Sequence, residues 1–268
     1  MIKTWQEGDV DSSGVKIHYY RTGGEGPKLI LLHGITDNGL CWPEVTEALG
    51  EKYDIIMLDA RGHGLSDHAA SYLPKDHVAD VDAVMENLGI AKAAVLGHSM
   101  GAVNASYFAV THPEKLSCLL LEDPPWHLEP QSIVRDNDQW RKDIILRRTR
   151  TLEDIMAEGE RDNPKWKDYV FPTWAEAKRQ VDPNVLDWAD KGQTFANWQQ
   201  IVRDLSCPTL LLTGGKEAIV DEATAKKAAA LNSLVSVANM SEAGHSIRRE
   251  QLDDYLKAVT PFLEKHAR

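Results

Sequence analysis

Short apolar stretches recur along the chain, and most of them end at a glycine or an acidic residue. Continuous apolar runs of this length are typical of strands that are buried on both faces of a sheet. They lie at residues 28–34 (KLILLHG), 53–59 (YDIIMLD), 93–97 (AAVLG), 116–122 (LSCLLLE) and 208–214 (PTLLLTG). Two further strands are predicted at residues 15–20 (VKIHYY), where apolar and polar positions alternate, and at residues 234–240 (LVSVANM).

Between the predicted strands, apolar residues recur with helical spacing. Residues 76–89 carry Val78, Val81, Met85 and Leu88 on one face, with acidic residues between them. Residues 102–110 (AVNASYFAV) suit a buried helix, and residues 249–266 predict an amphipathic helix that Pro261 kinks or interrupts.

The alternation of strands and helices predicts an α/β fold, with a mostly parallel sheet covered by helices on both faces. Ligands of such sheets bind at the carboxyl ends of the strands. Four polar residues lie at or just past these predicted ends: His33, Asp59, Ser99 and Asp123.

Residues 124–205 break this alternation. The segment is charged, has a helical pattern, and holds Trp126, Trp140, Trp166, Trp174, Trp188 and Trp198. It predicts a helical cap inserted into a core made of residues 1–123 and 206–268. Packing is the favoured role for most of these tryptophans. The alternative is that one or two line an acyl pocket, for which Trp126 is the candidate, together with His33 and Gly34 near the strand ends.

The cap also contains a basic run, RKDIILRRTR, at residues 141–150. Such a run usually forms one solvated face of a helix. The alternative is that it faces the cleft and attracts an anionic substrate.

Composition narrows the range of partners. The chain has 268 residues, is 43% hydrophobic and 26% charged, and carries a net charge of −11, which argues against nucleic acid and anionic membranes as partners. It lacks a membrane-spanning apolar run, and its first residues lack the apolar core of a signal peptide. The distant cysteines Cys41, Cys118 and Cys207 suit a cytoplasmic protein with free thiols.

The pentapeptide GHSMG at residues 97–101 follows a predicted strand and opens a predicted helix. A serine in this setting sits in a strained turn, so the positions two before and two after it must be small, as Gly97 and Gly101 are. Ser99 is therefore the candidate nucleophile. The amide of Met100, at the helix N-terminus, is a candidate oxyanion donor.

The other candidates come from distant loops. His33-Gly34 turns the chain after an earlier strand and would aim the amide of Ile35 at the same oxyanion. His245, in a loop after the last predicted strand, is the candidate general base. His98, next to the nucleophile, is expected to point elsewhere.

A second motif, DARGHGLSD at residues 59–67, also contains residue types that could form a site. Its glycines permit a turn, and Ser66 or Asp67 would cap the segment that follows. We therefore interpret Arg61, His63 and Asp67 as structural.

Taken together and in this order, these motifs resemble those of the α/β-hydrolase superfamily, over nearly the whole chain: HG at 33–34, DARGHGLSD at 59–67, GHSMG at 97–101 and AGHSIRRE at 243–250. The resemblance implies a Ser–His–acid triad beneath a lid. The usual position of the acid, after the strand that follows the cap, is held by Glu217, and the alternative position by Asp123, before two prolines. We favour Asp123 and keep Glu217 as the alternative.

The sequence thus predicts a serine esterase or lactonase that cleaves a small substrate through an acyl-enzyme. No H-x-x-x-H, C-x-x-C or phosphate-loop pattern has supporting context, so neither a metal nor a cofactor is expected. A serine nucleophile disfavours the dehalogenase and epoxide-hydrolase branches. Alternatives on the same fold are a carbon–carbon bond hydrolase, a perhydrolase, a cofactor-free dioxygenase or a ligand receptor. A monomer and a homodimer both remain open.

Overall fold

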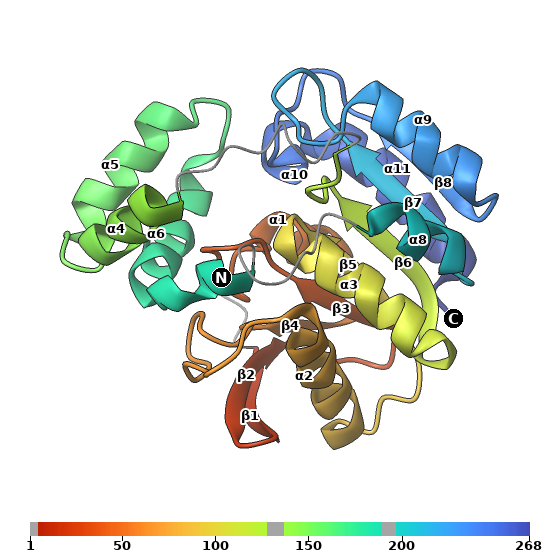
Figure 1. The fold of residues 1–268 in the computed structure, drawn as a ribbon, viewed down its shortest axis with the longest axis horizontal. Coiled ribbons are helices and arrows are strands. Elements are labelled where there is room, and N and C mark those ends of the chain that lie inside the picture. The colour runs from red at the N-terminus through yellow and green to blue at the C-terminus, as the bar shows by residue number, and fades with distance from the viewer. Residues whose placement is uncertain (1–4, 128–136, 189–196) are drawn as a thin grey trace.

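The computed structural model describes residues 5–127, 137–188 and 197–268, and its centre is an eight-stranded sheet (Figure 1). The strand order is β1-β2-β4-β3-β5-β6-β7-β8. Strand β2 runs antiparallel to β1 and β4, and the remaining neighbours are parallel, which confirms the predicted α/β class. The strands are β1 (Gln6–Ser12), β2 (Val15–Arg21), β3 (Lys28–Leu32), β4 (Asp54–Leu58), β5 (Ala93–His98), β6 (Leu116–Glu122), β7 (Thr209–Thr213) and β8 (Val235–Asn239).

The hydrophobic pattern does not predict β1. Its sequence, QEGDVDS, is mostly polar, and only Val10 and Ser12 are buried. The strand lies at the edge of the sheet and pairs only with β2. Edge strands tolerate exposed charged side chains, so no apolar run marks this one.

Helices cover both faces of the sheet (Figure 1). Adjacent side chains of β3 point to opposite faces, so that Ile30 and Leu32 join one core cluster and Leu29 and Leu31 join the other. The first cluster is covered by α2 (Pro74–Asn87), α3 (Met100–Thr111), α8 (Trp198–Asp204) and α9 (Glu222–Leu231), and the second by α1 (Pro43–Leu49), α10 (Ile247–Glu250) and α11 (Leu252–His266).

Of the two predicted effects of Pro261, a kink or an interruption, the structure excludes an interruption. Helix α11 continues through it to His266, and the helical break falls instead at Gln251. Pro261 is exposed, so the backbone carbonyl that it leaves without a helical partner can be hydrated.

The segment between β6 and β7 forms a separate group of helices beside the sheet (Figure 1). Helices α4 (Asn137–Arg147), α5 (Leu152–Asp162) and α6 (Phe171–Gln180) belong to this group, together with the short turns η3 (Asp168–Val170) and η4 (Pro183–Leu186). Ile155, Phe171 and Trp174 are part of a small core of their own. Helix α8, at the end of the segment, packs on α3 and α9 instead.

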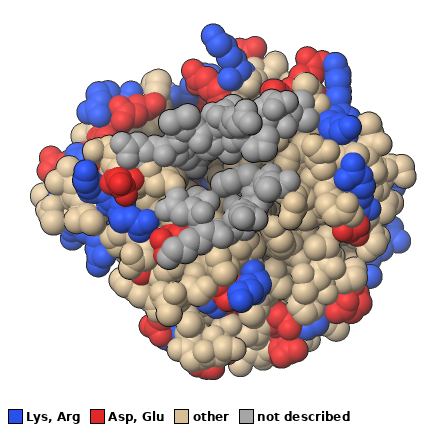
Figure 2. Space-filling view, viewed as in Figure 1, with Lys and Arg blue, Asp and Glu red and all other residues tan. Residues whose placement is uncertain are grey.

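None of the described helices is long and apolar enough to cross a membrane. On the described part of the surface shown in Figure 2, acidic and basic side chains are interspersed.

Candidate active site

Ser99 occupies a strained turn between β5 and α3. Its backbone angles are φ 54° and ψ −116°, a region that non-glycine residues seldom adopt. A Cβ atom at Gly97 would lie 2.3 Å from the carbonyl oxygen of Gly101, and one at Gly101 would lie 2.0 Å from that of Leu32. Both glycines are therefore required by the close approach of the backbone, as the pentapeptide indicates.

His245 and Asp123 are brought together from loops that are far apart in the sequence. The Nδ1 atom of His245 lies 2.6 Å from Oδ2 of Asp123. Asp123 is fully buried, and its carboxylate also accepts hydrogen bonds from the amides of Ile219 (2.9 Å) and Val220 (2.8 Å). An ionised carboxylate only accepts, so the ring proton is placed on Nδ1, and Nε2 is left as a base.

Glu217, the alternative acid, lies in the loop between β7 and α9 and is exposed. The structure pairs His245 with Asp123, while Ile219 and Val220, the residues just after Glu217, donate their amides to Asp123. This loop therefore holds the carboxylate of Asp123 in place beside His245.

Ser99 and His245 line one cavity of about 420 Å³. Gly34, Ile35 and His98 also belong to its core side. The helical segment between β6 and β7 contributes Trp140, Trp166, Trp174 and Lys178. The cavity therefore lies between the strand ends and this segment, whose side of the wall is largely aromatic.

The two candidate oxyanion donors belong to different segments near Ser99. Met100 is the first residue of α3, where backbone N–H groups have no acceptor within the helix. Ile35 lines the cavity in the loop after β3, and Thr36, the next residue, has a positive φ of 68°. Gly34 allows this loop to approach closely, because a Cβ there would lie 2.8 Å from Nδ1 of His98.

His98 does not point away from the site, contrary to the expectation. Its ring packs against that of His245 with centroids 4.8 Å apart, and its Nε2 lies 3.0 Å from the carbonyl oxygen of His245. Burial lowers the pKa of His98 well below its usual range, and the charge of Arg248 adds to the effect. A neutral His98 therefore holds His245 in place through these two contacts.

Two of the candidate pocket residues lie outside the lining of this cavity. His33 is buried, and its Nε2 accepts a hydrogen bond from the amide of Ala60 at 3.0 Å. Trp126 stacks on Trp198 with centroids 5.3 Å apart, within a core cluster. Both side chains are used in packing, whereas Gly34 does line the cavity.

The motif at residues 59–67 forms a turn fixed by its own polar contacts. Arg61 makes a buried bidentate ion pair with Asp80, at 2.7 and 2.6 Å. The Asp59 carboxylate accepts from the amides of Gly39 and Leu65. These contacts fit the structural interpretation.

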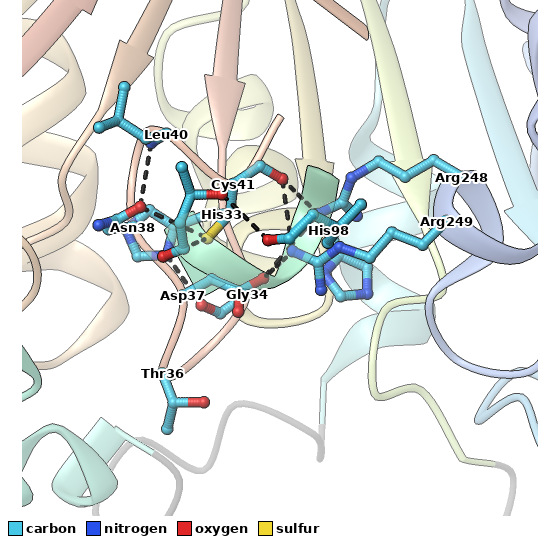
Figure 3. A network of polar contacts seen from close by, with 12 residues as sticks. His33, Gly34, Thr36, Asp37, Asn38, Leu40, Cys41, His98, Arg248 and Arg249 are labelled. Carbon is cyan, nitrogen blue, oxygen red and sulfur yellow. Dashed lines mark hydrogen bonds and ion pairs between the residues drawn. The ribbon is translucent and has the colours of Figure 1, made fainter. Parts of the chain in front are cut away.

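A buried ionic cluster in the cavity wall was not anticipated from the sequence (Figure 3). Oδ1 of Asp37 lies 2.8 Å from Nζ of Lys178, and its Oδ2 lies 2.9 Å from Nη2 of Arg249. Burial acts to raise the pKa of Asp37, but the charges of Arg249 and Lys178 outweigh it and hold the pKa well below its usual range. By contrast, Arg147 and Arg150 of the basic run at residues 141–150 both pair with Glu158, on the neighbouring helix α5.

The strand order, and a strained serine that lines one cavity with the histidine of a His–Asp pair, are features of a hydrolase of the α/β type. The chain belongs to the alpha/beta hydrolase fold family, whose sequence profile matches residues 27–248.

Within this family, the chain is similar to individual hydrolases. N-formylmaleamate deformylase of Pseudomonas putida is 30% identical over 261 residues, or 96% of each chain. The 2-(acetamidomethylene)succinate hydrolase of Mesorhizobium japonicum is 25% identical over 258 residues, covering 91% of this chain and 90% of its own. A crystal structure of an N-formylmaleamic acid deformylase from Pseudomonas putida, at 25% identity, superposes with a TM-score of 0.82 over 95% of this chain and 100% of the other.

Proposed function

We propose that the protein is a serine hydrolase that cleaves a small carboxylic ester or lactone. The observation that carries this proposal is the contact of 2.6 Å between His245 and Asp123, in a cavity whose wall includes Ser99 at its strained turn. These features supply a nucleophile, a base and a group that orients the base.

In the proposed reaction, Oγ of Ser99 attacks the substrate carbonyl and transfers its proton to Nε2 of His245. The amides of Ile35 and Met100 bind the oxyanion. His245 then protonates the leaving alcohol, and water hydrolyses the acyl-enzyme by the same route in reverse. Throughout, Asp123 holds the imidazole and stabilises its protonated form.

Cleavage of an amide is the second candidate. It is favoured by the resemblance to a deformylase over 96% of the chain. The same residues would serve, with His245 protonating a nitrogen leaving group.

The first experiment measures hydrolysis of p-nitrophenyl esters, from acetate to octanoate, by the wild type and by Ser99→Ala. We expect turnover by the wild type only, and the chain-length optimum will measure how long an acyl group the cavity of about 420 Å³ accommodates. A fluorophosphonate probe should label the wild type at Ser99. Absence of both turnover and labelling would refute a serine hydrolase and favour oxygenase chemistry or a receptor.

A further inference from the structure

We propose that the substrate carries a carboxylate and that Arg249 binds it inside the cavity. This rests on the proposed hydrolase function and specifies its substrate class. Arg249 lines the cavity with Ser99 and is only 5% exposed. Its guanidinium lies over the ring of Trp166 at 4.5 Å, so the aromatic cap wall helps to hold it in place.

Arg249 has hydrogen-bond donors to spare. Its Nη2 contacts Oδ2 of Asp37 at 2.9 Å and the carbonyl oxygen of Cys41 at 3.4 Å. Its Nε is buried and has no acceptor among the described residues. Buried donors are seldom left unpaired, so this guanidinium is suited to an acceptor that a ligand would bring.

Lys178, the other cation in the wall, has no free donor for a substrate carboxylate. Its ammonium group already donates to three acceptors: the carbonyl oxygen of Thr36 (2.8 Å), Oγ1 of Thr36 (2.9 Å) and Oδ1 of Asp37 (2.8 Å). An ammonium group has three N–H bonds, so all of them are used. Lys178 therefore contributes charge to the cavity, whereas Arg249 contributes both charge and donors.

The charges of the cavity wall favour an anion. Among the residues that line it, Lys178 and Arg249 are cations and Asp37 is the anion, which leaves one positive charge in excess. The neighbouring Arg248 is paired with Glu122 at 3.0 Å. The excess of positive charge on this wall attracts an anion, and a carboxylate matches the planar guanidinium.

The names of two relatives support this chemistry. N-formylmaleamate and 2-(acetamidomethylene)succinate, after which those proteins are named, both carry carboxylates. A small ester or amide with a free carboxylate is therefore the proposed class of substrate here.

The test compares two methyl esters of similar size that differ in charge. Monomethyl succinate carries a carboxylate, and methyl isocaproate has an isopropyl group in its place. For each, kcat/KM is measured by methanol release with the wild type, Arg249→Met, Arg249→Lys and the control Arg161→Met. Arg161 is exposed on α5, where it pairs with Asp162.

We expect the wild type to prefer monomethyl succinate by at least about tenfold, the effect of a charge-assisted hydrogen bond. Arg249→Met should reduce this preference to about one. Arg249→Lys should retain part of it, and Arg161→Met all of it. Because the preference is a ratio measured on one protein sample, a lower amount of folded variant cancels out.

Equal rates on both esters in the wild type, with both reactions abolished in Ser99→Ala, would overturn the carboxylate site and leave the proposed hydrolase intact. If neither ester reacts, calorimetric titration with succinate tests whether the cavity binds a carboxylate. Binding that Arg249→Met abolishes and Arg161→Met retains supports the site, and no binding to the wild type refutes it.

Discussion

Replacement of Asp123 by Asn separates the two candidate acids. The carboxylate accepts three hydrogen bonds: Oδ1 from the amide of Val220, and Oδ2 from the amide of Ile219 and from Nδ1 of His245. An Asn side chain has one accepting oxygen and one NH2 group. In either orientation, the NH2 group meets a backbone N–H, so that one hydrogen bond is lost.

The expected loss of activity exceeds the expected loss of stability. With the NH2 group toward His245, the ring must accept at Nδ1, which moves its proton to Nε2 and removes the base. In both orientations the imidazolium loses its counter-charge. A buried unsatisfied amide costs about 1–3 kcal/mol, whereas the same substitution in a Ser–His–Asp triad lowers kcat by about 10⁴-fold, or roughly 5.5 kcal/mol.

The assay measures kcat on p-nitrophenyl acetate for the wild type, Asp123→Asn and Glu217→Gln, with urea denaturation as the check on folding. Glu217 is exposed, so Glu217→Gln should stay within about twofold of the wild type. A large loss in Glu217→Gln, or an Asp123→Asn variant with more than about a tenth of wild-type activity, would refute this assignment of the acid.

Three further predictions concern buried positions. Lys178→Met removes three buried hydrogen bonds, to Thr36 and Asp37, but leaves Asp37 paired with Arg249, so the free energy of unfolding should fall by about 1–3 kcal/mol in urea titrations; an unchanged midpoint would contradict it. Gly101→Ala places a methyl group 2.0 Å from a carbonyl oxygen, so we expect a large fall in melting temperature by scanning fluorimetry. Burial raises the pKa of Cys41 and that of Cys118 to about 12, so mass spectrometry should find neither thiol alkylated by iodoacetamide until the protein unfolds.

The parts of the fold that the sequence predicts are those with a strong local signal. Strands β3 to β7 are buried on both faces and appear as continuous apolar runs. Strand β1 has two buried residues and lies at an edge, so its sequence resembles that of a loop. The effect of Pro261 also depends on its surroundings. Whether a proline interrupts a helix depends on whether the carbonyl four residues earlier is buried in protein or hydrated, and the sequence alone does not show this.

Within the site, the strained turn at Ser99 could be predicted because its cause is local. Gly97 and Gly101 meet backbone atoms of each other and of Leu32, and the pentapeptide itself contains two of these three residues. The choice between Asp123 and Glu217 was different. Both follow predicted strands, and what distinguishes them is the direction of the amides of the loop after β7, which only the folded chain reveals.

The ionic cluster shows most clearly why charge in a cavity is hard to read from a sequence. The basic run at residues 141–150 suggests a site for an anion, yet two of its arginines are paired with an acid on the neighbouring helix. The cations that reach the cavity, Lys178 and Arg249, each stand beside a single arginine in the sequence, and their partner Asp37 lies more than a hundred residues away. Charges close in sequence tend to neutralise one another at the surface, where an ion pair contributes little. Asp37, Lys178 and Arg249 meet only through the fold and are buried, so a positive site can lie within a chain whose net charge is −11.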